Sequence, residues 1–247
     1  MRFFDISEPL LDSTRQMFKD LENDTRDNKI DLGIGIYRDE YGLAPVFKAV
    51  KSAEKFLFNN ETSKSYKTPA GNHQYCKKIL DLVLGKTILE ERTNKIGSIQ
   101  IPGAGSGLRI AGELIKRNSK NKHISIPEPT WGQQTFMFEK SGLIITKHSY
   151  YDTKNNFLDF DSMINDLNKL KSGDSLLLHG CCHNPTGADL SVEQWEQVAH
   201  VCIQKGILPF IDLVYQGLGK GIEEDVLGIR KLIQIVPEAI ITVSSSK

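Results

Sequence analysis

The sequence has few cysteines and no long apolar run. Its 247 residues include four cysteines, of which Cys181 and Cys182 are adjacent, whereas a disulfide framework or a structural zinc site needs separated pairs. No stretch approaches the roughly eighteen apolar residues of a membrane span. The start turns acidic at Asp5 before a signal-like run can form. We therefore expect a soluble, cytoplasmic protein with reduced thiols and no membrane segment.

The chain also lacks an excess of either charge. Lys and Arg number 31, and Asp and Glu also number 31. Neither sign gathers in a long block, so no electrostatic feature favours nucleic acid or an anionic membrane as a partner. Hydrophobic residues make up 39% of the sequence, which is enough for a sizeable core. The composition favours a globular protein that acts on small molecules.

Short apolar runs alternate with helix-length amphipathic segments from about residue 96 onwards. The runs predicted as strands are residues 99–101, 124–126, 143–145, 176–178, 207–211 and 240–243. This alternation is typical of an α/β fold, with a mostly parallel sheet and helices on both faces. Ser191 and Gln194 form a predicted capping box at the start of one helix. Upstream, apolar spacing predicts further helices near residues 11–21, 46–57 and 79–83.

Ligands of such sheets bind in the loops that follow the carboxyl ends of the strands. The loop of residues 102–107 is rich in glycine and precedes a helix, so its backbone N–H groups are candidates for phosphate binding. A tight turn without a ligand, or half of a dinucleotide fingerprint, fits the same residues. Trp131 follows the next strand, where an indole either stacks on a planar ligand or belongs to the core.

Two later loops carry polar side chains after buried strands. Residues 178–187 contain two histidines and two cysteines, but these lie on one extended loop without a second ligand cluster, which disfavours a metal site. Asn184 precedes a proline, is held extended, and can present its amide to a ligand. Asp212 ends an apolar run, where a carboxylate needs a cation or hydrogen-bond donors, or else only caps the next turn. The final residue, Lys247, would by itself be a solvated tail.

Three motifs in chain order resemble the fold-type I pyridoxal-phosphate aminotransferases. They are Asn184-Pro185-Thr186-Gly187, Asp212-x-x-Tyr215 and Ser244-x-Ser246-Lys247. Residues 32–37, 179–187 and 215–217 are most similar to the aspartate and aromatic-amino-acid aminotransferase subgroup. Each motif is modest alone, but the ordered set is specific, and the resemblance covers nearly the whole chain.

The resemblance implies an architecture and an activity. Residues 1–11 would form an N-terminal arm, residues 12–44 the first segment of a small domain, and residues 45–247 a large domain that binds pyridoxal 5'-phosphate (PLP) and is incomplete at its C-terminus. The expected protein is a homodimeric transaminase. It would move an amino group from aspartate or an aromatic amino acid to 2-oxoglutarate by a ping-pong mechanism.

The resemblance also implies roles for individual residues. Lys247 would bind the cofactor covalently and transfer a proton, and Asp212 would pair with the protonated ring nitrogen. Tyr215 and Asn184 would donate to the phenolic oxygen of the ring, and Trp131 would stack on it. The residues expected at the phosphate are Gly103, Ala104, Gly105, Ser106 and Ser244, together with Tyr66 of the partner subunit. Those expected near the substrate are Gly35, Trp131 and Asn184.

The sequence departs from the family pattern in three respects. Its phosphate loop, Gly105-Ser106-Gly107-Leu108-Arg109, is one residue shorter than usual, so either Ala104 and Gly105 or Gly105 and Ser106 take the phosphate-binding places. Gln134 stands where the subgroup commonly has a histidine that supports the ring-binding aspartate. The arginines that bind substrate carboxylates are missing, because the chain stops at Lys247. We expect the 247-residue chain alone to be poorly stable and inactive.

Two other classes of protein compete with the transaminase hypothesis. A non-catalytic remnant would bind PLP or a partner chain without turnover, even as a dimer. A nucleotide-binding Rossmann domain would use residues 103–107 to bind a nicotinamide or flavin cofactor. Against the Rossmann domain, no acidic residue closes the second strand, although Glu128 lies close by.

Overall fold

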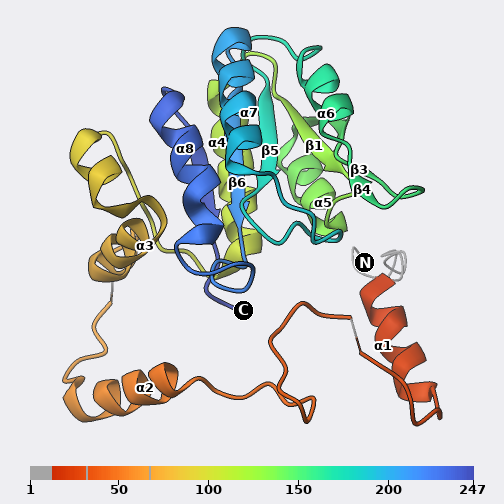
Figure 1. The fold of residues 1–247 in the computed structure, drawn as a ribbon. Helices are drawn as coiled ribbons and strands as arrows, with labels where there is room; N and C mark the ends of the chain where they lie inside the picture. The colour runs from red at the N-terminus through yellow and green to blue at the C-terminus, as the bar shows by residue number, and fades with distance from the viewer. Residues whose placement is uncertain (1–12, 32, 67) are drawn as a thin grey trace, which may run out of the picture. The chain divides into compact units, whose positions relative to one another are not determined.

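The computed structural model describes residues 13–31, 33–66 and 68–247 (Figure 1). These residues form two units. The N-terminal unit comprises the described residues up to Lys64 together with Lys247, and the sheet unit runs from Ser65 to Ser246. The predicted N-terminal arm, residues 1–11, lies outside the described residues. The domain boundaries expected from the family resemblance stay predictions.

The N-terminal unit contains two of the predicted helices. These are α1 (Ser13–Asn23) and α2 (Lys48–Asn60). The segment between them is held by short-range polar contacts: Asp31 accepts a 2.9 Å hydrogen bond from Gly33 N–H and a 2.7 Å bond from Arg38. Apolar side chains along α2 are exposed, including Phe56 and Phe58.

The sheet unit is built around a five-stranded sheet with the order β2-β1-β5-β6-β7. All neighbouring strands in it are parallel, which confirms the predicted α/β fold. The strands are β1 (His123–Glu128), β2 (Ile144–Ser149), β5 (Ser175–His179), β6 (Leu208–Leu213) and β7 (Ile240–Val243). An antiparallel pair, β3 (Tyr151–Asp152) and β4 (Phe157–Leu158), follows β2. The helices of this unit are α3 (His73–Glu91), α4 (Gly103–Asn118), α5 (Gly132–Ser141), α6 (Phe160–Leu167), α7 (Val192–Lys205) and α8 (Leu227–Ile235), with the 3-10 helix η1 (Glu224–Val226) before α8.

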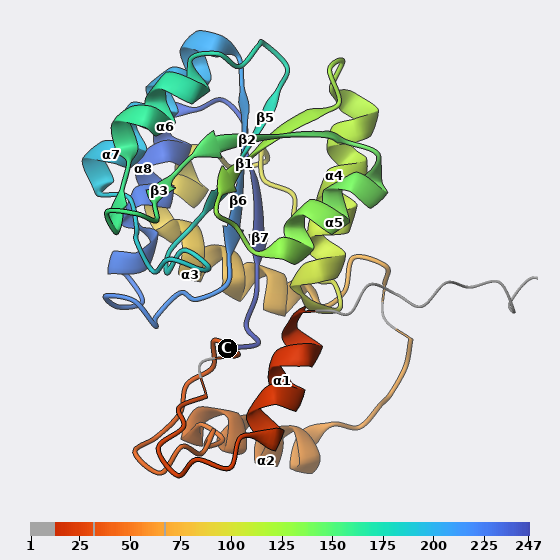
Figure 2. The same ribbon diagram turned by 90° about the vertical axis from the view of Figure 1, so that its right-hand side faces the viewer.

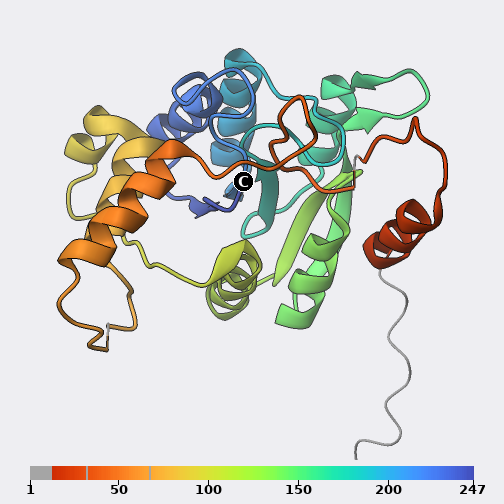
Figure 3. The same ribbon diagram turned by 90° about the horizontal axis from the view of Figure 1, so that it is seen from below.

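Helices cover both faces of this sheet (Figure 2). Successive strand residues point to opposite faces. Phe210 of β6 therefore packs with Phe138 of α5, with ring centroids 5.6 Å apart, in the cluster that α4 and α5 form on one face. Its neighbour Ile211 joins Trp195 of α7 and Leu232 of α8 on the other face. Figure 3 shows the green helices α4 and α5 on one side of the strands and the blue helices α7 and α8 on the other.

Local sequence signals set several helix ends. The predicted capping box is confirmed: the Ser191 hydroxyl accepts from Gln194 N–H, and the Gln194 side chain accepts from Ser191 N–H. Helix α7 ends at Lys205 and is capped by Gly206, whose φ of 67° favours glycine. Helix α3 is broken at Gly85, where φ is 72°.

The predicted strand at residues 99–101 is wrong. The segment forms no strand in the described structure. Its Gln100 N–H donates to the carbonyl of Ala70 at 2.9 Å, and its side chain accepts from Asn72 N–H at 2.8 Å. The segment therefore pairs with a loop rather than with a neighbouring strand. The glycine-rich residues after it, expected as a loop, form the first turn of α4.

Gly228→Ala is expected to destabilise the sheet unit by about 2 kcal/mol. Gly228 is buried in α8, and a Cβ there would lie 2.0 Å from Cδ1 of the buried Trp195. Either the indole or the helix must shift. Gly132→Ala is the matched control, because nothing lies within 4 Å of its Cβ, and the change should be neutral or slightly stabilising. Equal urea midpoints for Gly228→Ala and the wild-type chain would contradict the close packing.

Candidate functional site

The carboxyl ends of β5, β6 and β7 bring three polar side chains into one row. His179 is paired in register with Asp212, and Asp212 with Thr242. Residues opposite each other in parallel strands point to the same face of the sheet, and for these three it is the face that α4 and α5 cover. The side chain of Gln134, from α5, is hydrogen bonded to two members of this row, Asp212 and His179. The candidate site is thus built where ligands of parallel sheets bind.

The Asp212 carboxylate is the buried centre of this row. Only 4% of Asp212 is exposed. Its oxygens accept a 2.7 Å hydrogen bond from Gln134 Nε2 and a 3.0 Å bond from the Thr242 hydroxyl. Burial raises the pKa of Asp212, and the two hydrogen bonds lower it less strongly. Because both donors are uncharged, a cationic nitrogen at this carboxylate would stabilise its ionised form.

Asn184 and Tyr215 meet beside this carboxylate. The Asn184 side chain is hydrogen bonded to the Tyr215 phenol, which lowers the pKa of that phenol, while burial raises it by more. Both residues lie in loops that follow β5 and β6. An amide N–H and a phenol O–H together can donate to one ligand oxygen.

Two carboxylates that the sequence reasoning missed hold these loops in place. Asp189 accepts backbone N–H groups of Cys182 and His183, at 2.8 and 2.9 Å, in the loop that carries Asn184. Asp225 of η1 accepts N–H groups from four residues of the loop after Tyr215. The four donors are Gly217, Gly219, Lys220 and Gly221. For Asp225 the only sequence signal was its place shortly after the glycine-rich residues 217–221, and this signal does not say which groups the carboxylate contacts.

The N-terminus of α4 provides a place for an anion. The helix begins at Gly103, whose φ is 77°, and its first turn carries no acidic side chain. The N–H groups of such a turn have no partner within the helix and attract negative charge. A Cβ at Gly107 would lie 3.2 Å from Cγ2 of Thr242. This end of α4 is therefore packed directly against β7, next to Asp212.

The remaining predicted residues have different surroundings. Trp131 is the N-cap of α5 and is 37% exposed. Ser244 follows β7 and donates its N–H to the Leu213 carbonyl at 2.9 Å. Tyr66 is 94% exposed. Gly35 is an exposed residue of the N-terminal unit, and Lys247, which directly follows Ser246 in the chain, is grouped with that unit.

Two buried histidines, His148 and His183, and the partly buried His179 lie at this end of the sheet. The ring of His183 stacks on Tyr150 and on His179, with centroids 4.0 and 4.4 Å away. Burial lowers the pKa of His179 to about 4, of His183 to about 2 and of His148 to about 3. All three rings are therefore neutral at pH 7. Among the residues that the structure describes, no group of three or more His, Cys, Asp or Glu side chains is arranged to hold a metal ion.

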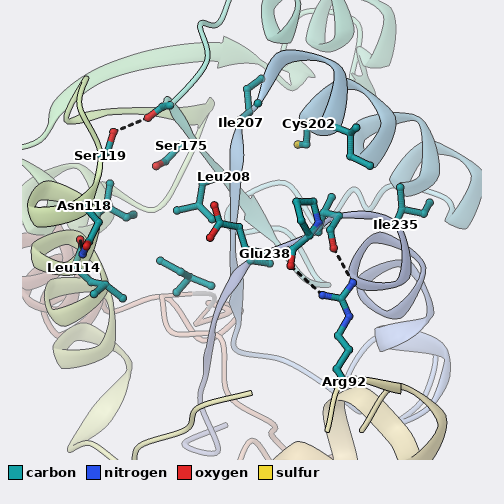
Figure 4. Close-up of a pocket in the computed structure, with 18 residues that line it drawn as sticks. Arg92, Leu114, Asn118, Ser119, Ser175, Cys202, Ile207, Leu208, Ile235 and Glu238 are labelled. Carbon is teal, nitrogen blue, oxygen red and sulfur yellow. Dashed lines mark hydrogen bonds between the residues drawn. The ribbon is translucent and has the colours of Figure 1, made fainter. Parts of the chain in front are cut away.

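A separate pocket of about 880 Å³ lies at the opposite end of the sheet (Figure 4). It is lined by Ser175, Leu208 and Ile240 at the starts of β5, β6 and β7. Arg92 closes one side and donates to the carbonyls of Val236 and Pro237, at 2.7 and 3.1 Å. The pocket is remote from Asp212.

In the described part of the chain, no helix is both long and apolar enough to cross a membrane.

Comparison with known proteins identifies the family. The family model described as "Aminotransferase class I and II" matches residues 27–247. The chain belongs to this aminotransferase family. The expected family and enzyme class are thereby confirmed, and the solved relatives described next confirm the fold class.

The chain is similar to several curated relatives. It is 40% identical over 224 residues to an aspartate aminotransferase of Escherichia coli (strain K12), and 42% identical over 224 residues to a tyrosine aminotransferase of Rhizobium meliloti (strain 1021). Both matches cover 91% of this chain and 57% of the relative. The chain thus spans little more than half the length of these relatives.

Solved structures resemble the aminotransferase chain closely. One is an aromatic amino acid aminotransferase from Burkholderia cenocepacia J2315, with a TM-score of 0.94 and 33% identity. Another is an aromatic-amino-acid aminotransferase from Burkholderia pseudomallei covalently bound to pyridoxal phosphate, with a TM-score of 0.94 and 30% identity. Each covers 100% of this chain, and the chain covers 62% of each.

Proposed function

We propose that this aminotransferase uses PLP to move an amino group from aspartate or an aromatic amino acid to 2-oxoglutarate, in a ping-pong reaction. The relatives are named for these amino donors, and one solved relative holds pyridoxal phosphate. The single observation that carries the proposal is Asp212, a buried carboxylate with uncharged donors at the end of β6. A protonated pyridine nitrogen is the group that such a carboxylate accommodates best.

The described residues fit PLP in charge and shape. Asp212 suits the ring nitrogen, the paired side chains of Asn184 and Tyr215 suit the phenolic oxygen, and the exposed indole of Trp131 suits the ring face. The first turn of α4 suits the phosphate. The residues we assign to the phosphate are Gly103, Ala104, Gly105, Ser106 and Ser244.

Two residues of the N-terminal unit take the remaining roles in this proposal. Bound PLP would supply an electron sink for the substrate carbanion. Lys247 would hold the cofactor covalently and, once released by the substrate, accept and return the Cα proton. A neutral amine is needed for both tasks, and the cationic ring nitrogen would favour it. Gly35 would line the substrate together with Trp131 and Asn184.

We further propose a cytoplasmic homodimer in which Tyr66 of the partner subunit reaches the phosphate. The almost fully exposed phenol of Tyr66 is available to a second chain. We also infer that residues 1–247 alone do not turn over, because they span 57% of the curated relatives' length. Turnover of purified residues 1–247 with aspartate or tyrosine would contradict this inference.

The proposed cofactor role is tested with purified residues 1–247 and PLP. We expect a visible absorption band that Lys247→Ala abolishes and that the exposed Lys120→Ala leaves intact. A band that survives Lys247→Ala would contradict the covalent role of this lysine. Binding of a nicotinamide or flavin cofactor without such a band would favour the Rossmann alternative. A dimer that binds PLP through Lys247 but never turns over, even when extended to the length of its relatives, would favour a non-catalytic remnant.

A further inference from the structure

Thr242 is a buried residue of β7 whose side chain touches two parts of the candidate site. It is 8% exposed and is paired with Asp212 in the register of β6 and β7. Its hydroxyl donates a 3.0 Å hydrogen bond to Asp212 Oδ1. Its methyl group, Cγ2, lies against the backbone of Gly107 in α4, where an added Cβ would be only 3.2 Å away. One short side chain therefore contacts both the carboxylate and the helix that provides the place for an anion.

The hydroxyl group of Thr242 has a single proton, and Asp212 is its better acceptor. The Ile211 carbonyl is also within reach, at 3.4 Å, but the carboxylate is closer and, when ionised, accepts more strongly. Burial raises the pKa of Asp212, and the hydrogen bonds from Gln134 and Thr242 lower it. The Thr242 hydroxyl thus fixes the place of one carboxylate oxygen from the side of β7.

The methyl group of Thr242 sets how closely α4 approaches β7. Gly107 is buried and directly follows residues 103–106, which are assigned to the phosphate. Because Gly107 has no side chain, the helix backbone rests on Thr242 and on Ile101, whose Cδ1 would lie 2.8 Å from an added Cβ. Removing the methyl group leaves a gap beneath this turn. The start of α4 then loses the contact that fixes its distance from the strand.

The two contacts of Thr242 are linked by its covalent structure. Threonine is branched at Cβ, so its hydroxyl and methyl groups share one carbon and turn together about χ1, which has few allowed values. A rotation that takes Oγ1 away from Asp212 also takes Cγ2 away from Gly107. The ring nitrogen and the phosphate of PLP belong to one compact molecule, so their two subsites must be correctly spaced before the cofactor can occupy both.

We propose that Thr242 is a positioning residue that sets the spacing between the Asp212 carboxylate and the first turn of α4, and hence between the subsites for the ring nitrogen and the phosphate. The inference rests on the proposed PLP-dependent function for the assignment of the two subsites. The spacing itself is a property of the cofactor-free chain. Valine at this position keeps the branched shape without the hydroxyl, and serine keeps the hydroxyl without the methyl group, so each contact can be removed alone.

The test measures the dissociation constants of PLP and of pyridoxal, which lacks the phosphate, in the 247-residue chain. Thr242→Val should weaken both ligands by the same factor, about 10-fold, because both lose a well-placed carboxylate. Thr242→Ser should weaken PLP about fivefold more than pyridoxal, because only PLP uses the start of α4. Thr146→Val and Thr146→Ser make the same changes at an exposed position of β2 and should leave both constants within about twofold of wild type.

NMR tests the same contacts without the cofactor. Thr242→Val should raise the titration midpoint of the Asp212 carboxyl, followed by carbon-13 NMR. Thr242→Ser should shift the Gly107 amide resonance and leave that midpoint close to wild type. An Asp212 midpoint that is unchanged in Thr242→Val would overturn the inference, and so would a ratio of PLP to pyridoxal affinity that is unchanged in Thr242→Ser.

The outcomes separate this inference from the proposed function. If the wild-type chain does not bind PLP, the proposed function fails, and the two NMR measurements still decide whether Thr242 holds Asp212 and α4. If one variant does not fold, the other decides through its own contact. A Gly107 resonance that is the same in Thr242→Ser and wild type would show that α4 keeps its place without the methyl group, and would also overturn the inference.

Discussion

Lowering the pH from 7 to 5 is expected to destabilise the sheet unit by about 5 kcal/mol. The cause is a set of three histidines, the buried His148 and His183 and the partly buried His179, whose pKa values fall to about 3, 2 and 4. The pKa of each is lowered chiefly by burial. The Asp166 carboxylate offsets part of this lowering at His148, and neighbouring histidine rings lower the pKa values of His148 and His183. These rings stay neutral in the folded chain as the pH falls.

The sign follows from counting protons in the two states. An unfolded histidine gains a proton near its ordinary pKa of 6.5, whereas the folded rings do not until the pH falls to their lowered pKa values. Between these limits the unfolded state binds more protons, so stability is full above about pH 6.5 and is lost as the pH falls. Each ring contributes up to about 1.4 kcal/mol per pH unit. A total of this size approaches the whole stability of an ordinary domain.

Urea unfolding at pH 7 and pH 5 measures this loss. A single replacement, His183→Gln, should remove about a third of the difference between the two pH values. It removes one titrating ring, although the lost stacking on Tyr150 should lower stability at both pH values. Equal free energies of unfolding for the wild-type chain at pH 7 and pH 5 would show that the rings are protonated in the folded state.

The regular part of the fold could be predicted from the sequence because it depends on local patterns. The alternation of apolar runs and amphipathic segments gave the parallel sheet, and Ser191 with Gln194 gave a helix start that the structure confirms. The predicted strand at residues 99–101 was wrong because an apolar run does not show whether a partner strand is available. In the described chain, Gln100 pairs with Ala70 instead.

The residues of the candidate site could be predicted where a motif lies near the end of a strand. They could not be predicted where their role depends on a contact between residues that are far apart in the sequence. Asp212 stood out because it ends an apolar run, and Asn184 because it precedes a proline in the loop after a buried strand. The roles of Gln134 and Asp225 were not visible in the same way. Gln134 meets Asp212 across 78 positions of sequence, and the four donors to Asp225 are backbone groups, which carry no residue-specific signal. The position of Gln134 was noted only as a departure from a family pattern.

Asp225→Ala is expected to destabilise the sheet unit by about 3 kcal/mol and to open the loop after Tyr215. Asp225 is 8% exposed. Its two oxygens accept N–H groups of Gly217 and Gly219, at 2.8 and 3.0 Å, and of Lys220 at 2.7 Å, with Gly221 at 3.4 Å. Alanine removes every one of these acceptors, and water can replace them only if the loop moves outward. The loss of stability in Asp225→Ala should therefore be larger than the loss caused by removing one ordinary hydrogen bond.

Hydrogen exchange of residues 217–221, followed together with urea unfolding, tests this role of Asp225. In Asp225→Ala these amides should exchange much faster while amides of β6 stay protected, because the loop can open without unfolding the strand. Asp225→Asn keeps one acceptor oxygen and should fall between alanine and wild type. The exposed neighbour Glu224 supplies the control, since Glu224→Ala removes a carboxylate from the same short helix, while the printed acceptor of these four amides is Asp225. Slow exchange at 217–221 in Asp225→Ala would mean that the glycine-rich backbone holds its own conformation. Tyr215 would then owe its position to Asn184 rather than to Asp225.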